Sequence, residues 1–332
     1  MNLHNSGISQ LFSKQGASNT HELYLNWTRY LPYIVLIVVF IAVSFVVPYF
    51  LTVPNILSVL LQTSSLAVLA IGQAAVLILG GIDLSMPGVM ALGAIFGAMY
   101  MESGGNSVIG GLVMILVPTT LGFINGVSIS YFNMIPFVVT MAMQAITIGA
   151  ATMITNQISI PVSQNFCDAI LKKVIGIPLP IIIMLVVALC SQFVMTKTYF
   201  GRWLYSAGTS IPTSKVSGIP TKRVVLAAYT FAGMMGGVAA IIMTSRLYAA
   251  SPQMGKDSVA MDIIASAAVG GVSTMGGVGT ALNAVVGAII ITLISNVMNM
   301  ANVSYYLTLV IKGLIIIAFV AIDANSRRKL SR

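Results

Sequence analysis

The stretch AVLILGGIDLSMPGVMALGAIFGAM, residues 75–99, contains one charged residue, Asp83. Apolar residues fill both sides of the diglycine Gly80–Gly81, and small residues recur through the second half. Such a run has no polar face to present to water, and small residues allow membrane helices to pack closely. The stretch therefore predicts a helix, an irregular glycine turn and a second helix, all within a membrane.

The whole chain has the same character. Of its 332 residues, 58% are hydrophobic and 7% are charged, and the mean hydropathy is +0.98. Soluble domains carry about 25% charged residues, so a soluble enzyme, a disordered chain and a disulfide scaffold are excluded. Membrane β-strands alternate in polarity over about ten residues, whereas the runs here stay apolar for the roughly 20 residues that a spanning helix needs. We therefore predict an all-α polytopic membrane protein.

Ten apolar runs predict ten transmembrane helices. They are 32–50, 55–80, 85–101, 108–131, 137–156, 178–196, 223–243, 259–275, 280–300 and 304–322. The run 55–80 is longer than one span needs, and its polar residues Gln62–Ser65 predict a break in the helix. The run 259–275 is short and ends in glycines, which predicts a partly re-entrant segment.

Basic residues set the orientation, because Lys and Arg accumulate on the cytoplasmic side. With ten spans and both termini inside, eleven of the sixteen basic residues are cytoplasmic: Lys14, Arg29, Lys197, Arg202, Lys215, Lys222, Arg223, Arg327, Arg328, Lys329 and Arg332. This bias explains the net charge of +9 without a nucleic-acid partner.

Three parts of the chain follow from this layout. A cytoplasmic tail spans 1–31, a single transmembrane domain spans 32–323 and includes the cytoplasmic loop 197–223, and a basic cytoplasmic tail spans 324–332. The segments 157–177 and 244–258 then face the outside.

The stretch 265–289, ASAAVGGVSTMGGVGTALNAVVGAI, resembles 75–99 without gaps. Gly80–Gly81 falls on Gly270–Gly271, and five small or apolar residues that follow also coincide. The coincidences predict a duplicated unit of helix, glycine turn and helix, as is common in transporters. A shared Gly/Ala-rich composition is the alternative explanation, and the relative direction of the two units stays open.

No motif for catalysis or nucleotide binding is present. The phosphate-binding pattern GxxxxGK[ST] is absent. Both histidines, His4 and His21, lie in the polar N-terminal tail, so no Ser/His/Asp set and no Cys/His metal cluster is predicted. We expect no enzyme activity, no metal and no cofactor in this chain. Transport driven by ATP would require ATP and magnesium to be bound by partner subunits.

Three ionisable residues fall within predicted spans, and such residues are functional candidates because they are costly in lipid. Asp83 and Asp262 lie beside predicted helix starts, where capping the helix is the alternative to a role in transport. Lys312 lies in the middle of a span, so we expect it to face the protein interior and to pair with an acidic residue.

The loop GRWLYSAGTSIPTSKVSGIPTKR, residues 201–223, is the most informative polar segment. Thr209 or Ser210 can cap a helix start, Pro212 suits its first turn, and Gly218 suits its end. These signals predict a helix of about seven residues on the cytoplasmic surface. Such a helix can insert into a groove of a partner; an ordinary interfacial loop is the alternative.

Three segments together resemble the permease subunits of bacterial sugar importers of the ATP-binding-cassette class: 71–99, 201–223 and 260–323. The specific signature is GGIDLS followed by a small-residue helix, and the resemblance runs from about residue 50 to 323. It implies a ten-span permease of the bacterial inner membrane that works as a pair. It also implies two ATPase domains or one fused tandem ATPase, and a periplasmic binding protein that delivers a sugar.

The resemblance further implies that the 201–223 loop contains the coupling helix that docks in the ATPase. The residues expected at that contact are Gly201, Arg202, Gly208, Thr209, Ser210, Thr213, Ser214, Lys215, Gly218 and Ile219. Thr213 and Ser214 replace paired alanines of the family, which implies an altered ATPase contact. Val278 replaces a basic residue of the second glycine motif, which is consistent with a divergent paralogue or one half of a heterodimer.

The expected mechanism is alternating access, in which a neutral polyol enters a cavity between two permeases. The expected residues of the substrate pathway are the polar side chains Gln62, Gln73, Asp83, Asn125, Asn283 and Asn296. All of the amides are equally suited to hydrogen bonds between helices. The rival function is an ion-coupled secondary transporter or channel that works without ATPase subunits. The sequence names neither the sugar nor the second permease.

Overall fold

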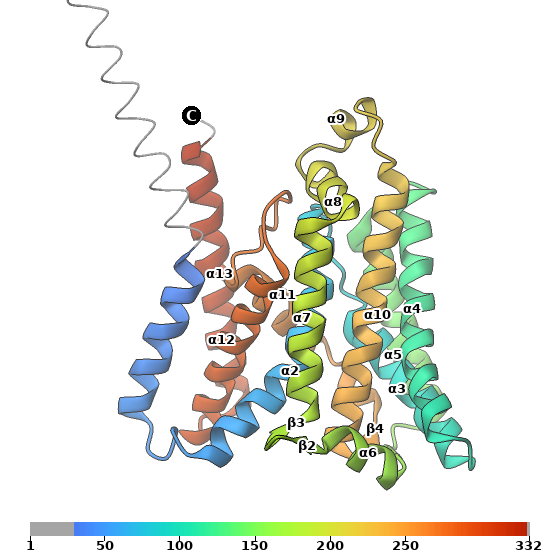
Figure 1. Cartoon of the computed structure of the whole chain (residues 1–332), viewed down its shortest axis with the longest axis vertical. Coiled ribbons are helices and arrows are strands. Elements are labelled where there is room, and N and C mark those ends of the chain that lie inside the picture. Colours follow the sequence, from blue (N-terminus) through green and yellow to red (C-terminus); the bar gives the residue numbers. More distant parts are fainter. Residues whose placement is uncertain (1–29, 331–332) are drawn as a thin grey trace, which may run out of the picture.

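The computed structural model describes residues 30–330 and is mostly helical (Figure 1). Ten of its helices correspond one to one to the predicted spans: Tyr30–Val46, α2 (Val53–Ile78), α3 (Met86–Glu102), α4 (Ser107–Ser130), α5 (Pro136–Thr155), α7 (Leu179–Lys197), α10 (Thr221–Leu247), α11 (Asp257–Val269), α12 (Ala281–Met300) and α13 (Tyr305–Leu330). Six helices in the described part are long and apolar enough to cross a membrane: α2, α4, α5, α7, α10 and α12. The predicted all-α membrane architecture is confirmed.

Successive membrane helices run in opposite directions between two ends (Figure 1). The end that we call the α9 end carries α8 (Tyr199–Thr209) and α9 (Ile211–Val216). The helix Tyr30–Val46 begins at this end and α13 finishes there (Figure 1). From the start of the first described helix to the end of α13, the chain therefore passes between the two ends an even number of times.

The opposite end, which we call the α6 end, carries one short helix and two pairs of short strands. They are α6 (Gln164–Leu171), β1 (Ile160–Pro161) paired with β4 (Ala249–Ala250), and β2 (Lys173–Val174) paired with β3 (Ile177–Pro178). The hydroxyl of Tyr248 donates to Asp168 Oδ1 over 2.8 Å and ties the end of α10 to α6. The predicted loop 157–177 and the beginning of the predicted loop 244–258 thus meet at this end, whereas Gly255 near the end of the second loop bonds Gln144 in the middle of α5.

Helix α2 is the central helix and packs against α7, α10, α11 and α12. The predicted break at residues 62–65 is wrong, because α2 is continuous from Val53 to Ile78. Ser64 and Ser65 donate their hydroxyls to the carbonyl oxygens of Leu61 and Gln62. Since these two hydroxyls are satisfied within the helix, they can be buried without interrupting it, whereas the neighbouring Thr63 hydroxyl is buried without a partner in the described part of the chain.

Helix α11 has 13 residues and is therefore about 20 Å long, short of the roughly 30 Å of a bilayer core. An eleven-residue non-helical segment, 270–280, follows it. The predicted short helix is confirmed, but the chain continues through it from the α6 end to the α9 end (Figure 1), so the segment is not re-entrant.

The two glycine turns have the same geometry. Gly80 follows α2 with φ of 78°, and Gly271 follows α11 with φ of 89°, a left-handed conformation that favours glycine. Gly80 donates its N–H to Leu77, and Gly271 donates to Ala268, at equivalent positions. Gly80 therefore corresponds to Gly271, and the predicted pairing with Gly270 is one residue out of register.

Both repeat units run towards the α9 end, turn there and return (Figure 1). The duplication is therefore parallel, which the sequence left open. The units diverge after the turn, because α3 begins at Met86 and α12 begins at Ala281 after a longer non-helical segment.

Candidate functional site

The predicted surface helix is present at the α9 end. It is α9, six residues long, and the hydroxyl of its N-cap Ser210 accepts the N–H of Thr213. Pro212 lies in its first turn, and Gly218 lies two residues beyond its end with φ of 79°. The capping signals in the sequence therefore placed this helix correctly.

Helix α9 presents apolar side chains outwards. Val216 is 87% exposed and Ile211 is 47% exposed, whereas Ser214 is 2% exposed. The Ser214 hydroxyl lies 2.9 Å from the hydroxyl of Ser206 in α8, which fixes α9 to α8. Of the two departures from the family's paired alanines, only Thr213 lies on the exposed side.

Helix α8 is held against the membrane helices by close contacts. A Cβ on Gly201 would overlap the backbone at the end of α7. The Arg202 guanidinium lies 4.3 Å from the centroid of the Tyr199 ring, a cation–π contact. Tyr205 donates its hydroxyl to the carbonyl oxygen of Gly279 over 2.7 Å. Burial raises the pKa of Tyr205, so this hydroxyl keeps the proton that it donates.

Gly208 lies where α8 meets both glycine turns. A Cβ on Gly208 would overlap the carbonyl oxygen of Ile78 and would lie 2.9 Å from the nitrogen of Gly277. Gly277 in turn donates its N–H to that same Ile78 oxygen over 2.8 Å. We call Gly208, Ile78 and Gly277 the glycine junction. Helix α8, the end of α2 and the 270–280 segment are therefore in direct backbone contact at one point.

The remaining predicted coupling residues lie at the same end. The Thr209 hydroxyl donates to the carbonyl oxygen of Tyr205. Lys215 is exposed on α9, and Ile219 is half-buried and donates its N–H to Ser214. All ten predicted coupling residues therefore lie in α8, α9 or the short segments that adjoin them.

Three predicted substrate-pathway residues, Gln73, Asp83 and Asn125, form one buried polar cluster. Asp83 Oδ1 accepts both the N–H and the hydroxyl of Ser85, at 2.8 and 2.6 Å, and Asn125 donates to that hydroxyl. In the amide orientation that satisfies both its groups, Gln73 bonds the backbone N–H and carbonyl of Asp83. Within the described residues, Asn125 Oδ1 and the Tyr229 hydroxyl are buried without a partner. The cluster holds the chain between α2 and α3, and Asp83 bonds the N-cap residue of α3.

Gln144 lies in the middle of α5, eight residues after Pro136 and eleven before Thr155. Its Oε1 accepts the N–H of Gly88 in the first turn of α3, and its Nε2 donates to the carbonyl oxygen of Gly255, both over 2.8 Å. The N–H groups of a first helical turn have no partner within their own helix, so Gln144 caps α3 from another helix. The starts of α3 and α11 therefore lie at the depth of the middle of a spanning helix.

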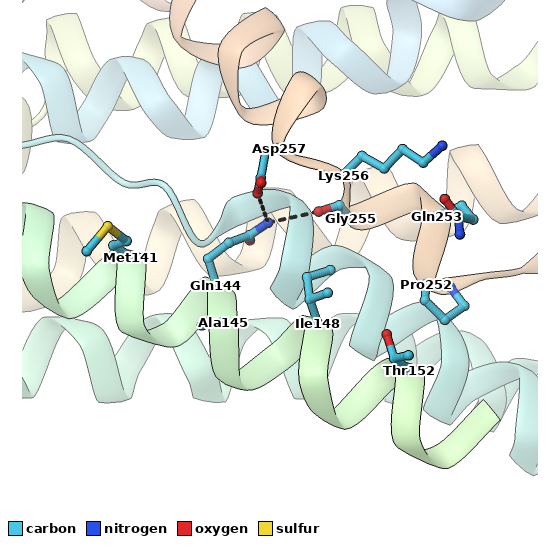
Figure 2. Close-up of a pocket in the computed structure, with 10 residues that line it drawn as sticks. All are labelled: Met141, Gln144, Ala145, Ile148, Thr152, Pro252, Gln253, Gly255, Lys256 and Asp257. Carbon is cyan, nitrogen blue, oxygen red and sulfur yellow. Dashed lines mark hydrogen bonds between the residues drawn. The ribbon is translucent and has the colours of Figure 1, made fainter. Parts of the chain in front are cut away.

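A pocket of about 500 Å³ opens beside Gln144, between α5 and the turn η1 (Pro252–Gly255) that precedes α11 (Figure 2). Its polar side chains are Gln144, Thr152, Gln253, Lys256 and Asp257. Asp257 is the first residue of α11, and its Oδ1 lies 3.4 Å from Gln144 Nε2. Lys256 extends away from Asp257 (Figure 2), and both charged residues are exposed.

The other predicted pathway residues lie elsewhere. Asn283 accepts the hydroxyl of Thr280 at the start of α12. Asn296 of α12 and Asn55 of α2 exchange amide hydrogen bonds of 2.9 and 3.3 Å. Gln62 is half-buried on α2. The structure thus joins Gln73, Asp83 and Asn125 and separates the remaining three.

Lys312 of α13 and Asp262 of α11 form an ion pair, with both carboxylate oxygens 2.9 Å from Nζ. Lys312 is 9% exposed. The expectation that Lys312 faces the interior beside an acidic partner is confirmed, and the pair ties the short helix α11 to α13.

Sequence reasoning did not identify Gln144, Lys256 or Asp257 as site residues. The available signal was one amide in the apolar run 137–156 and a charged pair beside the short run 259–275. The partners of Gln144 lie 56 and 111 residues away in the chain, so no local pattern connects them.

Comparison with known proteins gives a consistent result over most of the chain. Residues 55–320 match the family described as branched-chain amino acid transport system / permease component. The chain is 35% identical over 304 residues to the D-allose transport system permease protein of Escherichia coli (strain K12), which covers 90% of this chain and 92% of the relative. It is 34% identical over 300 residues to the ribose import permease protein of Haemophilus influenzae, covering 88% and 91%, and 33% identical over 295 residues to that of Bacillus subtilis, covering 88% and 91%. No solved structure matches.

Proposed function

The chain belongs to this permease family, and on that premise we propose that it is the membrane-spanning subunit of an ATP-driven, binding-protein-dependent sugar importer that works by alternating access. The observation that carries the proposal is the glycine junction beneath α9. Helix α8 contacts both repeat turns through Gly208 and is hydrogen-bonded to α9, so a force that α9 receives from a partner can pass through α8 into the membrane domain.

The substrate assignment rests on the full-length relatives. The family description names branched-chain amino acids, but the relatives that cover about nine tenths of this chain are named for D-allose and ribose. We therefore assign a neutral sugar of pentose or hexose size to this chain.

The partner at the α9 end is an ATPase, present as two domains or as one fused tandem chain. Ile211 and Val216 enter its cleft, and the exposed Thr213 and Lys215 lie beside them. ATP and magnesium belong to that partner, and this chain performs the transport step without catalysis. The α9 end accordingly lies in the cytoplasm of the bacterial cell, with both chain termini, and the chain is a multi-pass protein of the inner membrane.

Two further partners complete the importer. A second permease copy or paralogue forms the other wall of the cavity, and a periplasmic sugar-binding protein docks at the α6 end. The loops 157–177 and 244–258 meet there through β1–β4 and the Tyr248–Asp168 hydrogen bond, which makes a firm platform.

A reconstitution experiment tests the proposal against an ion-coupled carrier. The chain, its ATPase and its binding protein are placed in proteoliposomes, with ATP on the α9 side and radiolabelled D-ribose or D-allose with binding protein on the other. We expect uptake that requires ATP and the binding protein and that continues when an ionophore dissipates ion gradients. Uptake that persists without ATP and stops with the ionophore would show an ion-coupled carrier instead.

A further inference from the structure

We infer that the pocket beside Gln144 is the site that holds the sugar half-way across the membrane, and that Asp257 and Lys256 bind its hydroxyl groups. The inference rests on the proposed function and adds to it the residues and the chemistry of the substrate site.

The depth of the pocket is the first argument. Gly255 is hydrogen-bonded to Gln144 in the middle of α5, and Lys256 and Asp257 follow it directly. Both side chains are exposed on this subunit. A charged side chain that faced lipid at this depth would be costly, and charges inside membranes face a water-filled cavity or a partner group. The pocket therefore opens onto the aqueous passage of the transporter.

The chemistry of the lining is the second argument. The volume of about 500 Å³ lies within the range of about 300–1,000 Å³ that small-molecule sites occupy. The Asp257 carboxylate accepts hydrogen bonds from hydroxyl groups and the Lys256 ammonium donates them. One negative and one positive charge leave the lining without net charge, which favours a neutral polyol over an ion. Met141 and Ile148 supply an apolar wall for the C–H face of a sugar ring.

Gln144 is a positioning residue in this site. Its amide is already bonded to Gly88 and Gly255. The same Nε2 lies 3.4 Å from Asp257 Oδ1 and orients the carboxylate towards the pocket (Figure 2). The buried cluster of Gln73, Asp83 and Asn125 is less suited to a sugar, because its side chains bond the backbone and Ser85 around the entry to α3.

The pocket is also connected to the α9 end. Asp257 is the first residue of α11, and α11 leads into the segment 270–280 that contains Gly277 of the glycine junction. A shift of α8 that moves Gly277 therefore moves α11 and its first residue. This connection gives the ATPase a direct means to change the affinity of the pocket for sugar.

Charge-neutralising variants test the site in the assembled importer. Asp257→Asn and Lys256→Gln are compared with the controls Glu102→Gln and Lys197→Gln, which change exposed charges outside the pocket. Because hydrogen bonds to charged groups are strong, we expect uptake of D-ribose or D-allose to fall about tenfold or more in both pocket variants. The controls should stay within about twofold of the wild type on the same scale. Pocket variants that transport as well as the controls would overturn the inference.

A labelling experiment decides the question if the pocket variants fail to assemble. Thr152→Cys is introduced into a Cys190→Ser background and labelled with a charged methanethiosulfonate reagent. We expect D-ribose or D-allose to slow labelling severalfold. A labelling rate that is the same with and without either sugar would overturn the inference. Failure of the wild-type importer to take up sugar with ATP would instead contradict the proposed function, so the two failures are distinct.

Discussion

The carbonyl oxygen of Ile78, at the end of α2, accepts the N–H of Gly277 over 2.8 Å, and Gly277 belongs to the second repeat. The turn regions of the two repeat units are therefore joined by one backbone hydrogen bond. Gly208 of α8 packs against the same oxygen. The single surface helix α8 thus contacts both halves of the duplication at one point.

Replacing Gly208 with alanine should weaken the stimulation of ATP hydrolysis by the loaded binding protein. The new Cβ would overlap the Ile78 oxygen, and overpacking of this kind typically costs about 1–3 kcal/mol. We expect stimulation of ATP hydrolysis by the loaded binding protein to fall about tenfold, in line with that cost. Gly149→Ala in α5 is the matched control, because no atom lies within 4 Å of the place that its new methyl group would occupy. Normal stimulation of ATP hydrolysis in the Gly208→Ala importer would show that the contact between Gly208 and Ile78 does not link the membrane domain to the ATPase.

Replacing Gly218 with valine should disturb α9 through the backbone alone. Its φ is 79° and no atom lies within 4 Å of the position of a Cβ. A β-branched residue in this left-handed conformation is strained by about 1–2 kcal/mol, so the end of α9 should shift while the membrane helices stay intact. We expect ATP hydrolysis to lose its dependence on the loaded binding protein, with normal membrane insertion. Gly218→Asn, which tolerates this φ, should retain most of the transport rate, and equal loss in both variants would argue against a backbone cause.

Two neighbouring hydroxyls of α9 should have different effects. Ser214→Ala removes the buried contact with Ser206, and a lost hydrogen bond of this kind typically costs about 0.5–1.5 kcal/mol. We expect Ser214→Ala to lower the unfolding temperature, and Thr213→Ala to leave it unchanged while altering the affinity for the ATPase. Thermal unfolding in detergent and co-purification of the ATPase measure the two effects. If Ser214→Ala instead altered the affinity for the ATPase and left the unfolding temperature unchanged, Ser214 would lie at the partner surface.

Much of the fold follows from local pattern, and the exceptions have physical causes. Apolar runs bounded by turn residues placed all ten helices, and the cap at Ser210 placed α9. The predicted break in α2 failed because Ser64 and Ser65 satisfy their hydroxyls inside the helix. The repeat was one residue out of register because only backbone geometry shows which glycine of Gly270–Gly271 is left-handed.

The candidate site was only partly predictable. The ten residues predicted to contact the ATPase lie close together in the sequence, so a local motif contains them all. Gln144, by contrast, bonds Gly88 and Gly255 across two tertiary contacts. The role of its amide is apparent only in the folded structure, where the starts of α3 and α11 both lie beside the middle of α5.

The hydrogen bond between Tyr248 and Asp168 predicts sensitivity to alkaline pH at the α6 end. The bond to Asp168, followed by partial burial, raises the pKa of Tyr248 above its ordinary value of about 10. A raised folded-state pKa stabilises the fold below the unfolded value, and that contribution is lost as the pH rises through the folded value. The difference in unfolding temperature between wild type and Tyr248→Phe should therefore be constant below about pH 10 and shrink above it. Asp168→Asn should remove this pH dependence, and a difference that grows with pH would contradict the assignment.

The ion pair between Lys312 and Asp262 should stabilise α11 only while both partners are present. Lys312→Met leaves the Asp262 carboxylate, whose side chain is 24% exposed, without its cation. Breaking a fully buried pair costs about 3–5 kcal/mol, so we expect a loss near the lower end of that range. Replacing both residues, as Lys312→Met with Asp262→Leu, removes the unpaired charge, so most of the lost stability should return. Thermal unfolding in detergent of the wild type, both single variants and the double variant measures the coupling between the two positions. Asn296→Leu is a useful comparison, because it removes a neutral contact between α12 and α2 and should cost only about 1–3 kcal/mol. Additive losses in the double variant would show that the two charges act independently, and α11 would then be held by its packing against α12 and α2 alone.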